Sequence, residues 1–142
     1  PIIVMLAAMI PIGTALQTTG VSSLIATSIS SYASSLSLFW ILLIILIVTM
    51  VTTDIINNAA TAVIMAPIST GIALELGYAI EPFLMVVAVG ASCAFLTPIG
   101  HQCNTVVMGP GNYKFTDYWR MGLPMDILII LASIPMILFV WT

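Results

Sequence analysis

Two clusters of polar side chains interrupt a sequence that is otherwise strongly apolar. The first cluster consists of Asp54, Asn57, Asn58 and Thr61, and the second of Thr97, His101, Gln102, Asn104 and Thr105. Polar groups in apolar surroundings are costly unless they are paired, so such groups usually face a bundle interior or an aqueous cavity. Asparagine can offer a carbonyl oxygen to a cation and amide hydrogens to an anion. The two clusters therefore predict a binding site for small ions.

The composition places this site in a membrane. Of the 142 residues, 61% are hydrophobic and 5% are charged, whereas a soluble domain carries roughly 25% charged residues. The mean hydropathy is +1.25. We predict an all-α polytopic membrane protein in contact with the lipid bilayer. With a net charge of -3 and only two basic residues, nucleic-acid binding is excluded.

The longest apolar runs predict spanning helices. They are Leu38–Thr53 (LFWILLIILIVTMVTT) and Met121–Thr142, with further apolar segments over 1–18 and 20–37. Between them, NYKFTDYWR carries both basic residues, Lys114 and Arg120. The positive-inside rule puts this stretch in the cytoplasm and the glutamates Glu75 and Glu81 outside. Because apolar runs stand at both ends of the sequence, we expect a fragment of a longer polytopic protein.

The segment 54–77 predicts a re-entrant helical hairpin. It is apolar enough for the membrane, holds the first polar cluster at one end and contains Pro67. Arms of about ten to twelve residues on either side of Pro67 would each cross roughly half a bilayer core. The alternative is one spanning helix kinked at Pro67. The sequence alone does not decide between them.

A second irregular segment, 82–111, predicts a broken helix. It runs apolar from Pro82 to Leu96 and continues as TPIGHQCNTVVMGPG, whose prolines and glycines exclude a regular helix over 97–111. Irregular backbone at membrane depth occurs only where it is buried in protein or lines a polar cavity. In transporters such a break marks a binding site. A surface loop is the alternative, and the apolar TVVM after the break argues against it.

Several polar residues also have plainer interpretations. Asp54 could cap the following helix, Asn57 and Asn58 could join neighbouring helices, and His101 could be a hydrogen-bonded structural histidine. Asp54 and His101 could also form the acid–base pair of an intramembrane hydrolase. However, the sequence contains no GxSxG, no HExxH and no paired catalytic aspartates. We therefore expect a protein that is not an enzyme and has no organic cofactor.

At the two clusters the sequence resembles the divalent anion:sodium symporter family. TDIINNAATAVIMAPI is similar to that family's second hairpin, which has a Ser-Asn-Thr motif at its tip. SCAFLTPIGHQCNTVVMGPG, followed by KFTDYWRMGLPM, is similar to the family's unwound helix and last helix. The resemblance implies two inverted repeats and a homodimer, with residues 1–142 as the second, C-terminal repeat that works together with the first. The implied location is the plasma (inner) membrane of a prokaryote.

The resemblance also implies residue roles in sodium-coupled transport of a small divalent anion. Sodium, the coupling ion, would be held by Thr53, Ile56, Asn58, Gly100 and Gln102. The anion would contact Asn57, Asn58, Ala59, His101 and Asn104. The tip departs from the family pattern, because Asn57 replaces Ser and Ala59 replaces Thr.

The broken helix departs as well, with His101 in place of Thr and Gln102-Cys103 in place of Pro-Pro. These changes leave the substrate open between a dicarboxylate, sulfate and a related oxyanion. The GHQ variant resembles a branch often joined to cytoplasmic regulatory domains, which favours sulfate. A sodium/proton antiporter or arsenite-type permease of the same superfamily, and a non-transporting membrane subunit, are the alternatives.

Overall fold

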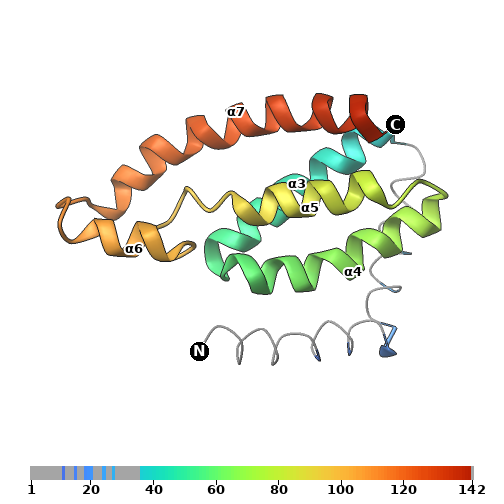
Figure 1. Cartoon of the computed structure of the whole chain (residues 1–142), viewed down its shortest axis with the longest axis horizontal. Helices are drawn as coiled ribbons and strands as arrows, with labels where there is room; N and C mark the ends of the chain where they lie inside the picture. The colour runs from blue at the N-terminus through green and yellow to red at the C-terminus, as the bar shows by residue number, and fades with distance from the viewer. Residues whose placement is uncertain are drawn as a thin grey trace.

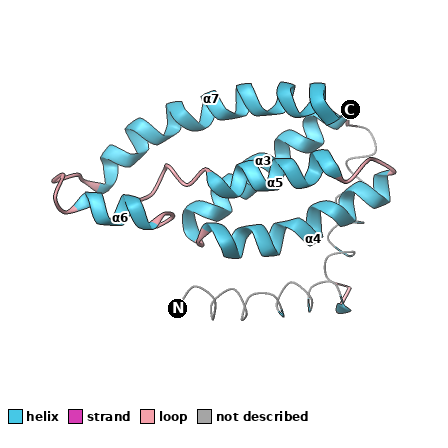
Figure 2. Cartoon of the chain, viewed as in Figure 1, coloured by secondary structure: helices cyan, strands magenta, loops and turns pink. Residues whose placement is uncertain are grey.

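Helices make up all the regular structure of the described part of the chain (Figure 2). The computed structural model describes residues 36–141 and, before them, 18–20 and the single residues Pro11, Ala15, Leu24 and Thr27. The helices over 36–141 are α3 (Leu38–Ile55), α4 (Asn58–Leu76), α5 (Glu81–Ser92), α6 (Gln102–Met108) and α7 (Phe115–Trp141). The apolar segments predicted over 1–18 and 20–37 lie almost wholly outside the described residues.

Three of these helices are long and apolar enough to cross a membrane. They are α3 with 18 residues, α4 with 19 and α7 with 27. The chain is an all-α polytopic membrane protein, as its composition predicts. Helix α7 begins at Phe115 rather than at the predicted Met121, because Asp117 Oδ2 accepts a hydrogen bond from the Lys114 N–H at 2.8 Å and closes the first turn.

Helix α5 is the centre of the bundle. Helices α3 and α4 meet at a tip formed by Ile56 and Asn57 and diverge from it, and α5 packs against both (Figure 1). Helix α7 lies across α3 and α5. The fully buried side chains of the shared core include Leu42, Leu46, Ile72, Phe83 and Val86.

The segment predicted as a hairpin broken at Pro67 is one continuous helix, α4. The Asn57 side chain caps its start by accepting from the Ala60 N–H at 2.9 Å. Gly77 ends it in the left-handed conformation, with φ 73°. Pro67 lacks an N–H but does not end the helix. The chain instead turns at Ile56–Asn57, before α4, so the interpretation with a break at Pro67 is corrected; re-entry into the membrane stays a prediction.

The polar segment after α5 interrupts the helical path. Helix α5 ends at Ser92, residues 93–101 are irregular, and α6 resumes at Gln102. A regular helix is therefore absent from 97–101, as expected from Pro98 and Gly100. No regular helix runs unbroken through 97–111, as the sequence predicts, and α6 occupies Gln102–Met108 within that range. Helix α6 itself contains no glycine or proline. Gly109, Pro110 and Gly111 follow its last residue, Met108.

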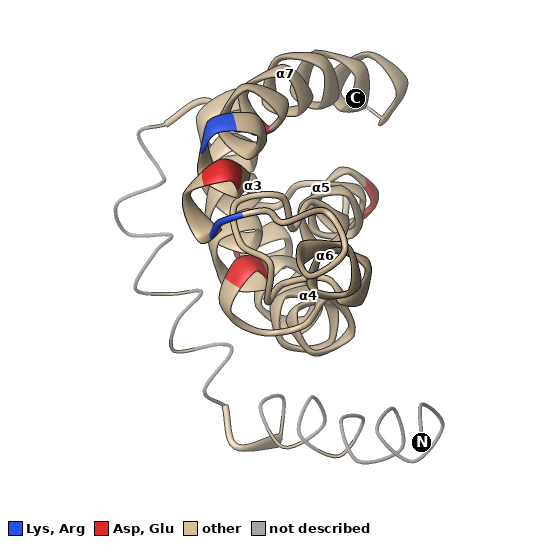
Figure 3. Ribbon diagram, turned by 90° about the vertical axis from the view of Figure 1, so that its left-hand side faces the viewer, with Lys and Arg blue, Asp and Glu red and all other residues tan. Residues whose placement is uncertain are grey.

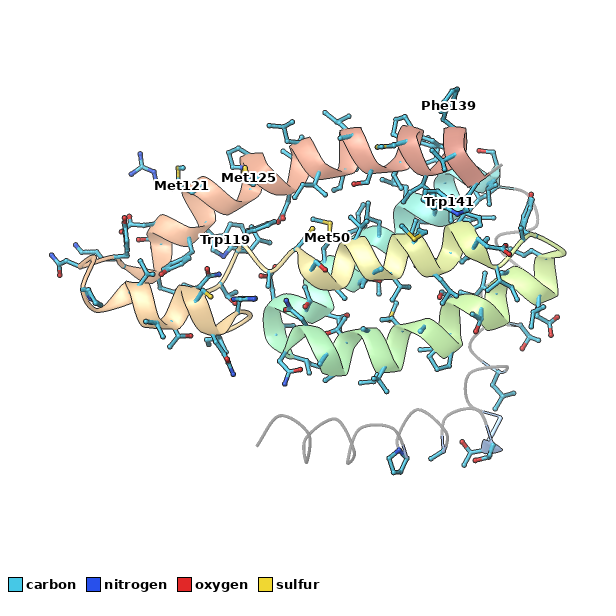
Figure 4. All side chains as sticks on the ribbon, in the orientation of Figure 1. Met50, Trp119, Met121, Met125, Phe139 and Trp141 are labelled. Carbon is cyan, nitrogen blue, oxygen red and sulfur yellow. The ribbon has the colours of Figure 1, made fainter. Side chains whose placement is uncertain are left out.

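Exposed apolar side chains cover the outer face of α7. Phe139 is 90% exposed and points away from the other helices (Figure 4), whereas Met50 on α3 is 3% exposed and lies between helices. Such a face suits contact with lipid or with another apolar surface. In contrast, α3 and α5 approach closely at Gly90, where an added Cβ would lie 2.9 Å from Thr49 Cβ. Small residues at such a crossing allow close helix packing in membranes.

The two basic residues lie near each other in sequence at one end of the bundle. Lys114 belongs to the loop before α7 and Arg120 to the first turns of α7 (blue in Figure 3). The opposite end carries the exposed Glu75 and Glu81, at the α4–α5 connection. The positive-inside rule thus places the end with Lys114 and Arg120 and the end with Glu75 and Glu81 on opposite sides of the membrane.

This orientation can be tested by labelling single cysteines. Ala79, between α4 and α5, and Gly109, between α6 and α7, are both exposed. In a full-length protein lacking its other cysteines, Ala79→Cys should react with an impermeant maleimide added outside the cell. Gly109→Cys should react with the maleimide only after the membrane is permeabilised. Labelling of Gly109→Cys alone in intact cells would show the reverse orientation.

Candidate functional site

The tip between α3 and α4 brings together side chains from both helices. The Thr53 hydroxyl, in the last turn of α3, lies 2.9 Å from Asn58 Oδ1 at the start of α4. It also lies 3.0 Å from the Ala91 carbonyl oxygen in α5. Its single hydrogen can go to either acceptor. When it goes to Ala91, the oxygens of Thr53 and Asn58 are left facing each other, an arrangement that a cation would stabilise.

Asp54 ties the end of α3 to the irregular segment 93–101. Its Oδ1 accepts a hydrogen bond from the Leu96 N–H at 3.1 Å. Its backbone carbonyl accepts from the Thr97 hydroxyl at 2.7 Å. Asp54 is 5% exposed. It does not cap α4, because Asn57 is the capping residue. The interpretation of Asp54 as a helix cap is therefore wrong.

Gly100 gives the irregular segment its closest approach to α3. A Cβ added at Gly100 would lie 3.0 Å from the Thr53 carbonyl oxygen and 3.1 Å from Asp54 Cα. It would also lie 2.8 Å from Ala94 Cβ. Backbone atoms cannot move aside as the end of a flexible side chain can. This position therefore requires glycine if the segment is to stay against the end of α3.

The irregular segment is also braced from α6 and α7. The Asn104 amide donates to the carbonyl oxygens of Ala94 at 2.9 Å and Thr97 at 3.3 Å. The Tyr118 hydroxyl donates to the Asn104 carbonyl oxygen at 2.7 Å. Both hydrogens of the Asn104 amide therefore have backbone acceptors. In this conformation Asn104 holds the shape of the segment, whereas the sequence analysis predicts that it contacts the anion.

His101 and Gln102 lie on the exposed side of the same region. His101 Nδ1 accepts from the Cys103 N–H at 3.2 Å, which makes His101 the N-cap of α6. In a neutral imidazole the proton then resides on Nε2, which is left as a donor. The imidazole is not hydrogen-bonded to Asp54, whose side chain bonds to Leu96. The Asp54–His101 acid–base pair is thus not assembled in this structure.

Among the residues predicted for the cation, the structure brings three into one place. Thr53, Asn58 and Gly100 are joined by the close approaches described above. Ile56 and Gln102 are exposed nearby at the tip and at the start of α6. Among the residues predicted for the anion, Asn57 and His101 are exposed, and Ala59 is partly buried in the first turn of α4. Helix α4 directs the N–H groups of this first turn toward the tip.

Two residues of α7 at the same site were not singled out from the sequence. A Cβ added at Gly122 would lie 2.5 Å from the Phe95 carbonyl oxygen and 3.0 Å from the Leu96 nitrogen, so α7 presses on the irregular segment there. Asp126 is 7% exposed, and its Oδ1 has no hydrogen-bond partner. A carboxylate inside an otherwise apolar spanning run was the sequence signal for Asp126. No local sequence pattern predicts the contact of Gly122 with the irregular segment, because that contact depends on the tertiary fold.

Comparison with known proteins identifies the relatives of this chain. Residues 1–142 match the family described as the sodium:sulfate symporter transmembrane region. An uncharacterized transporter of Synechocystis sp. is 37% identical over 140 residues, covering 99% of this chain and 23% of that protein. An uncharacterized transporter of Escherichia coli is 37% identical over 137 residues, covering 96% of this chain and 22% of that protein.

A more distant relative has a named transport activity. Sodium/sulfate cotransporter 2 of Chlamydomonas reinhardtii is 29% identical over 129 residues, covering 90% of this chain and 15% of that protein. The chain thus spans less than a quarter of the length of each of these relatives.

The close approach at Gly100 gives a stability prediction with a matched control. Gly100→Ala should destabilise the full-length protein by about 1–3 kcal/mol, since the new methyl group meets backbone atoms that cannot yield. Gly109→Ala adds the same group where no atom lies within 4 Å, and it should change stability by less than about 0.5 kcal/mol. The midpoints of thermal unfolding in detergent provide the comparison. Equal midpoints for the two variants would contradict the packing of Gly100 against α3.

Proposed function

Because this chain belongs to the sodium:sulfate symporter family, we propose that it forms part of a secondary transporter that couples sodium to the uptake of a small divalent anion. The observation that carries the proposal is the meeting of the α3–α4 tip with the irregular segment between α5 and α6. Polar oxygen atoms and helix N–H groups converge there at an interruption of two helical paths. Such interruptions bind ions in transporters.

The cation side of this proposal uses oxygen atoms of the tip. The Thr53 hydroxyl and Asn58 Oδ1, 2.9 Å apart, would coordinate sodium together with backbone oxygens of Ile56 and Gly100 and with Gln102. Hard cations favour oxygen ligands of this kind. The Thr53 hydroxyl would then donate its hydrogen to the Ala91 carbonyl, already 3.0 Å away. The site would thus form with little movement of the side chain.

The anion side uses donors that surround the same tip. The first turn of α4 offers N–H groups at Asn58 and Ala59, and a helix N-terminus favours negative charge. Asn57 stands beside this turn, and His101 Nε2 adds a donor from the start of α6. Asn104 would act on the anion indirectly, by fixing the irregular segment that carries His101. Sulfate is the favoured substrate, and a dicarboxylate is the alternative.

The proposal extends to the rest of the transporter. The first repeat of the same protein would supply a second hairpin and broken helix, and two copies would form a homodimer. Relatives in Synechocystis sp. and Escherichia coli support a location in the plasma membrane of a prokaryote. Lys114 and Arg120 would face the cytoplasm.

Uptake by the full-length protein tests the function directly. Radiolabelled sulfate should accumulate in proteoliposomes when a sodium gradient is applied, and it should not accumulate with an equal potassium gradient. Succinate in the same assay distinguishes a dicarboxylate transporter. Uptake of neither anion, with sodium–proton exchange instead, would support the antiporter alternative. Absence of any flux in a folded protein would support the non-transporting subunit.

Two substitutions distinguish the residue proposed to bind both ions from the residue proposed to bind the anion alone. Asn58→Ala should weaken the apparent affinity for both sodium and the anion by about tenfold or more, because a hydrogen bond to a charged group contributes roughly 1.5–3 kcal/mol. His101→Thr should change substrate preference, because it removes the Nε2 donor proposed for the anion. The sodium concentration at half-maximal uptake should stay the same in His101→Thr. A change in sodium affinity alone in that variant would contradict its assignment to the anion.

A further inference from the structure

Asp126 lies on α7 close to the contact between that helix and the irregular segment. It lies four residues after Gly122 in α7, and residues at this spacing share one face of a helix. Gly122 packs directly on the backbone of Phe95 and Leu96. Asp126 is 7% exposed and its Oδ1 has no hydrogen-bond partner. An unpartnered, buried carboxylate oxygen thus lies about one helical turn from the contact of α7 with the irregular segment.

Asp54 supplies a second such oxygen. Its Oδ1 bonds to the Leu96 N–H at 3.1 Å, while its Oδ2 is buried without a partner. The Leu96 nitrogen is therefore close both to Asp54 Oδ1 and to Gly122 of α7. Helices α3 and α7, which carry the two aspartates, are also in direct contact.

A buried carboxylate needs either a cation or a proton to balance its charge. A buried charge left unpaired costs several kcal/mol even after relaxation of its surroundings. Among residues 36–141 neither carboxylate has a basic partner, and Lys114 and Arg120 are both exposed. Ionisable groups that persist inside a membrane protein under these conditions commonly hold an ion. Two unpartnered carboxylate oxygens from different helices offer the start of a coordination shell.

We propose that Asp54 and Asp126 bind a sodium ion between α3 and α7, separate from the one proposed at Thr53, Asn58 and Gly100. The choice of sodium rests on the proposed function, and the carboxylate oxygens are ligands that a hard cation prefers. Helix α7 provides no residue to the first cation site, so Asp126 distinguishes the two. Bound sodium would connect α7 to the end of α3 across the irregular segment.

The test uses sodium binding and uptake by the full-length protein. Asp126→Asn keeps the size of the side chain and removes its charge. It should raise the sodium concentration for half-maximal uptake about tenfold or more, as expected for the loss of one charged ligand. It should also reduce the rise in unfolding temperature that sodium causes relative to potassium. Glu75→Gln, at an exposed carboxylate on α4, is the matched control and should change neither quantity.

Combining variants shows whether there are two sites. If the sites are distinct, the effects of Asp126→Asn and Asn58→Ala on the free energy of sodium binding should add in the double variant. If Asp126 merely positions the first site, the double variant should be no worse than Asn58→Ala. Asp54→Asn gives the same test should Asp126→Asn fail to fold. An unchanged sodium response in both aspartate variants would overturn the proposal.

Other outcomes separate this inference from the proposed function. If the wild-type protein binds sodium without transporting an anion, and Asp126→Asn loses that binding, the transport proposal fails and the sodium site stands. If sodium drives anion uptake equally in the wild type and in Asp126→Asn, only the sodium site between α3 and α7 fails. A variant that loses only a pH dependence would show that the two aspartates share a proton, which also overturns the sodium proposal.

Discussion

The attachment of Asp54 to the irregular segment is the interaction on which the arrangement of the site depends. One residue at the end of α3 accepts from the Leu96 N–H with its carboxylate and from the Thr97 hydroxyl with its carbonyl oxygen. Backbone outside a helix needs such partners, because apolar surroundings provide no water for its polar groups. Asn104 and Gly122 also hold the segment between α5 and α6, but only the Asp54 contacts attach it to the end of α3 by hydrogen bonds. The contact between Thr53 and Gly100 follows from this attachment.

Glycine makes the same arrangement sterically possible. Gly90 lets α5 approach α3, Gly100 lets the irregular segment rest on the end of α3, and Gly122 lets α7 press on the other side of that segment. In a membrane there is little hydrophobic driving force between helices, so close van der Waals contact carries more of the association. The three glycines thus lie at successive contacts of one assembly. A side chain at any of them would separate elements that the polar contacts hold together.

The elements that could be predicted from the sequence are those fixed by local composition. The uniformly apolar run beginning at Leu38 predicts α3 almost to its end, and Pro98 with Gly100 predicts an irregular stretch. Whether Pro67 interrupts the helix could not be decided from the sequence, since a proline ends a helix or is accommodated within it according to the contacts around it. The hydrogen-bond partner of the Asp54 carboxylate could not be predicted either. Its hydrogen bond to Leu96 spans 42 positions of sequence, and no local pattern indicates such a contact.

The proximity of the proposed cation and anion ligands has a thermodynamic consequence. Ile56 and Asn58 are assigned to the cation, and Asn57, Asn58 and Ala59 to the anion, so neighbouring residues of one tip serve both ions. Any change that sodium makes in the conformation of this tip must alter the affinity for the anion, and the anion must alter the affinity for sodium by the same factor. The opposite charges of the two ions favour joint binding at this distance. Coupling in the proposed transporter would therefore arise within the tip itself, and α7 would take part through the packing of Gly122 on the irregular segment and through the sodium ion proposed at Asp126.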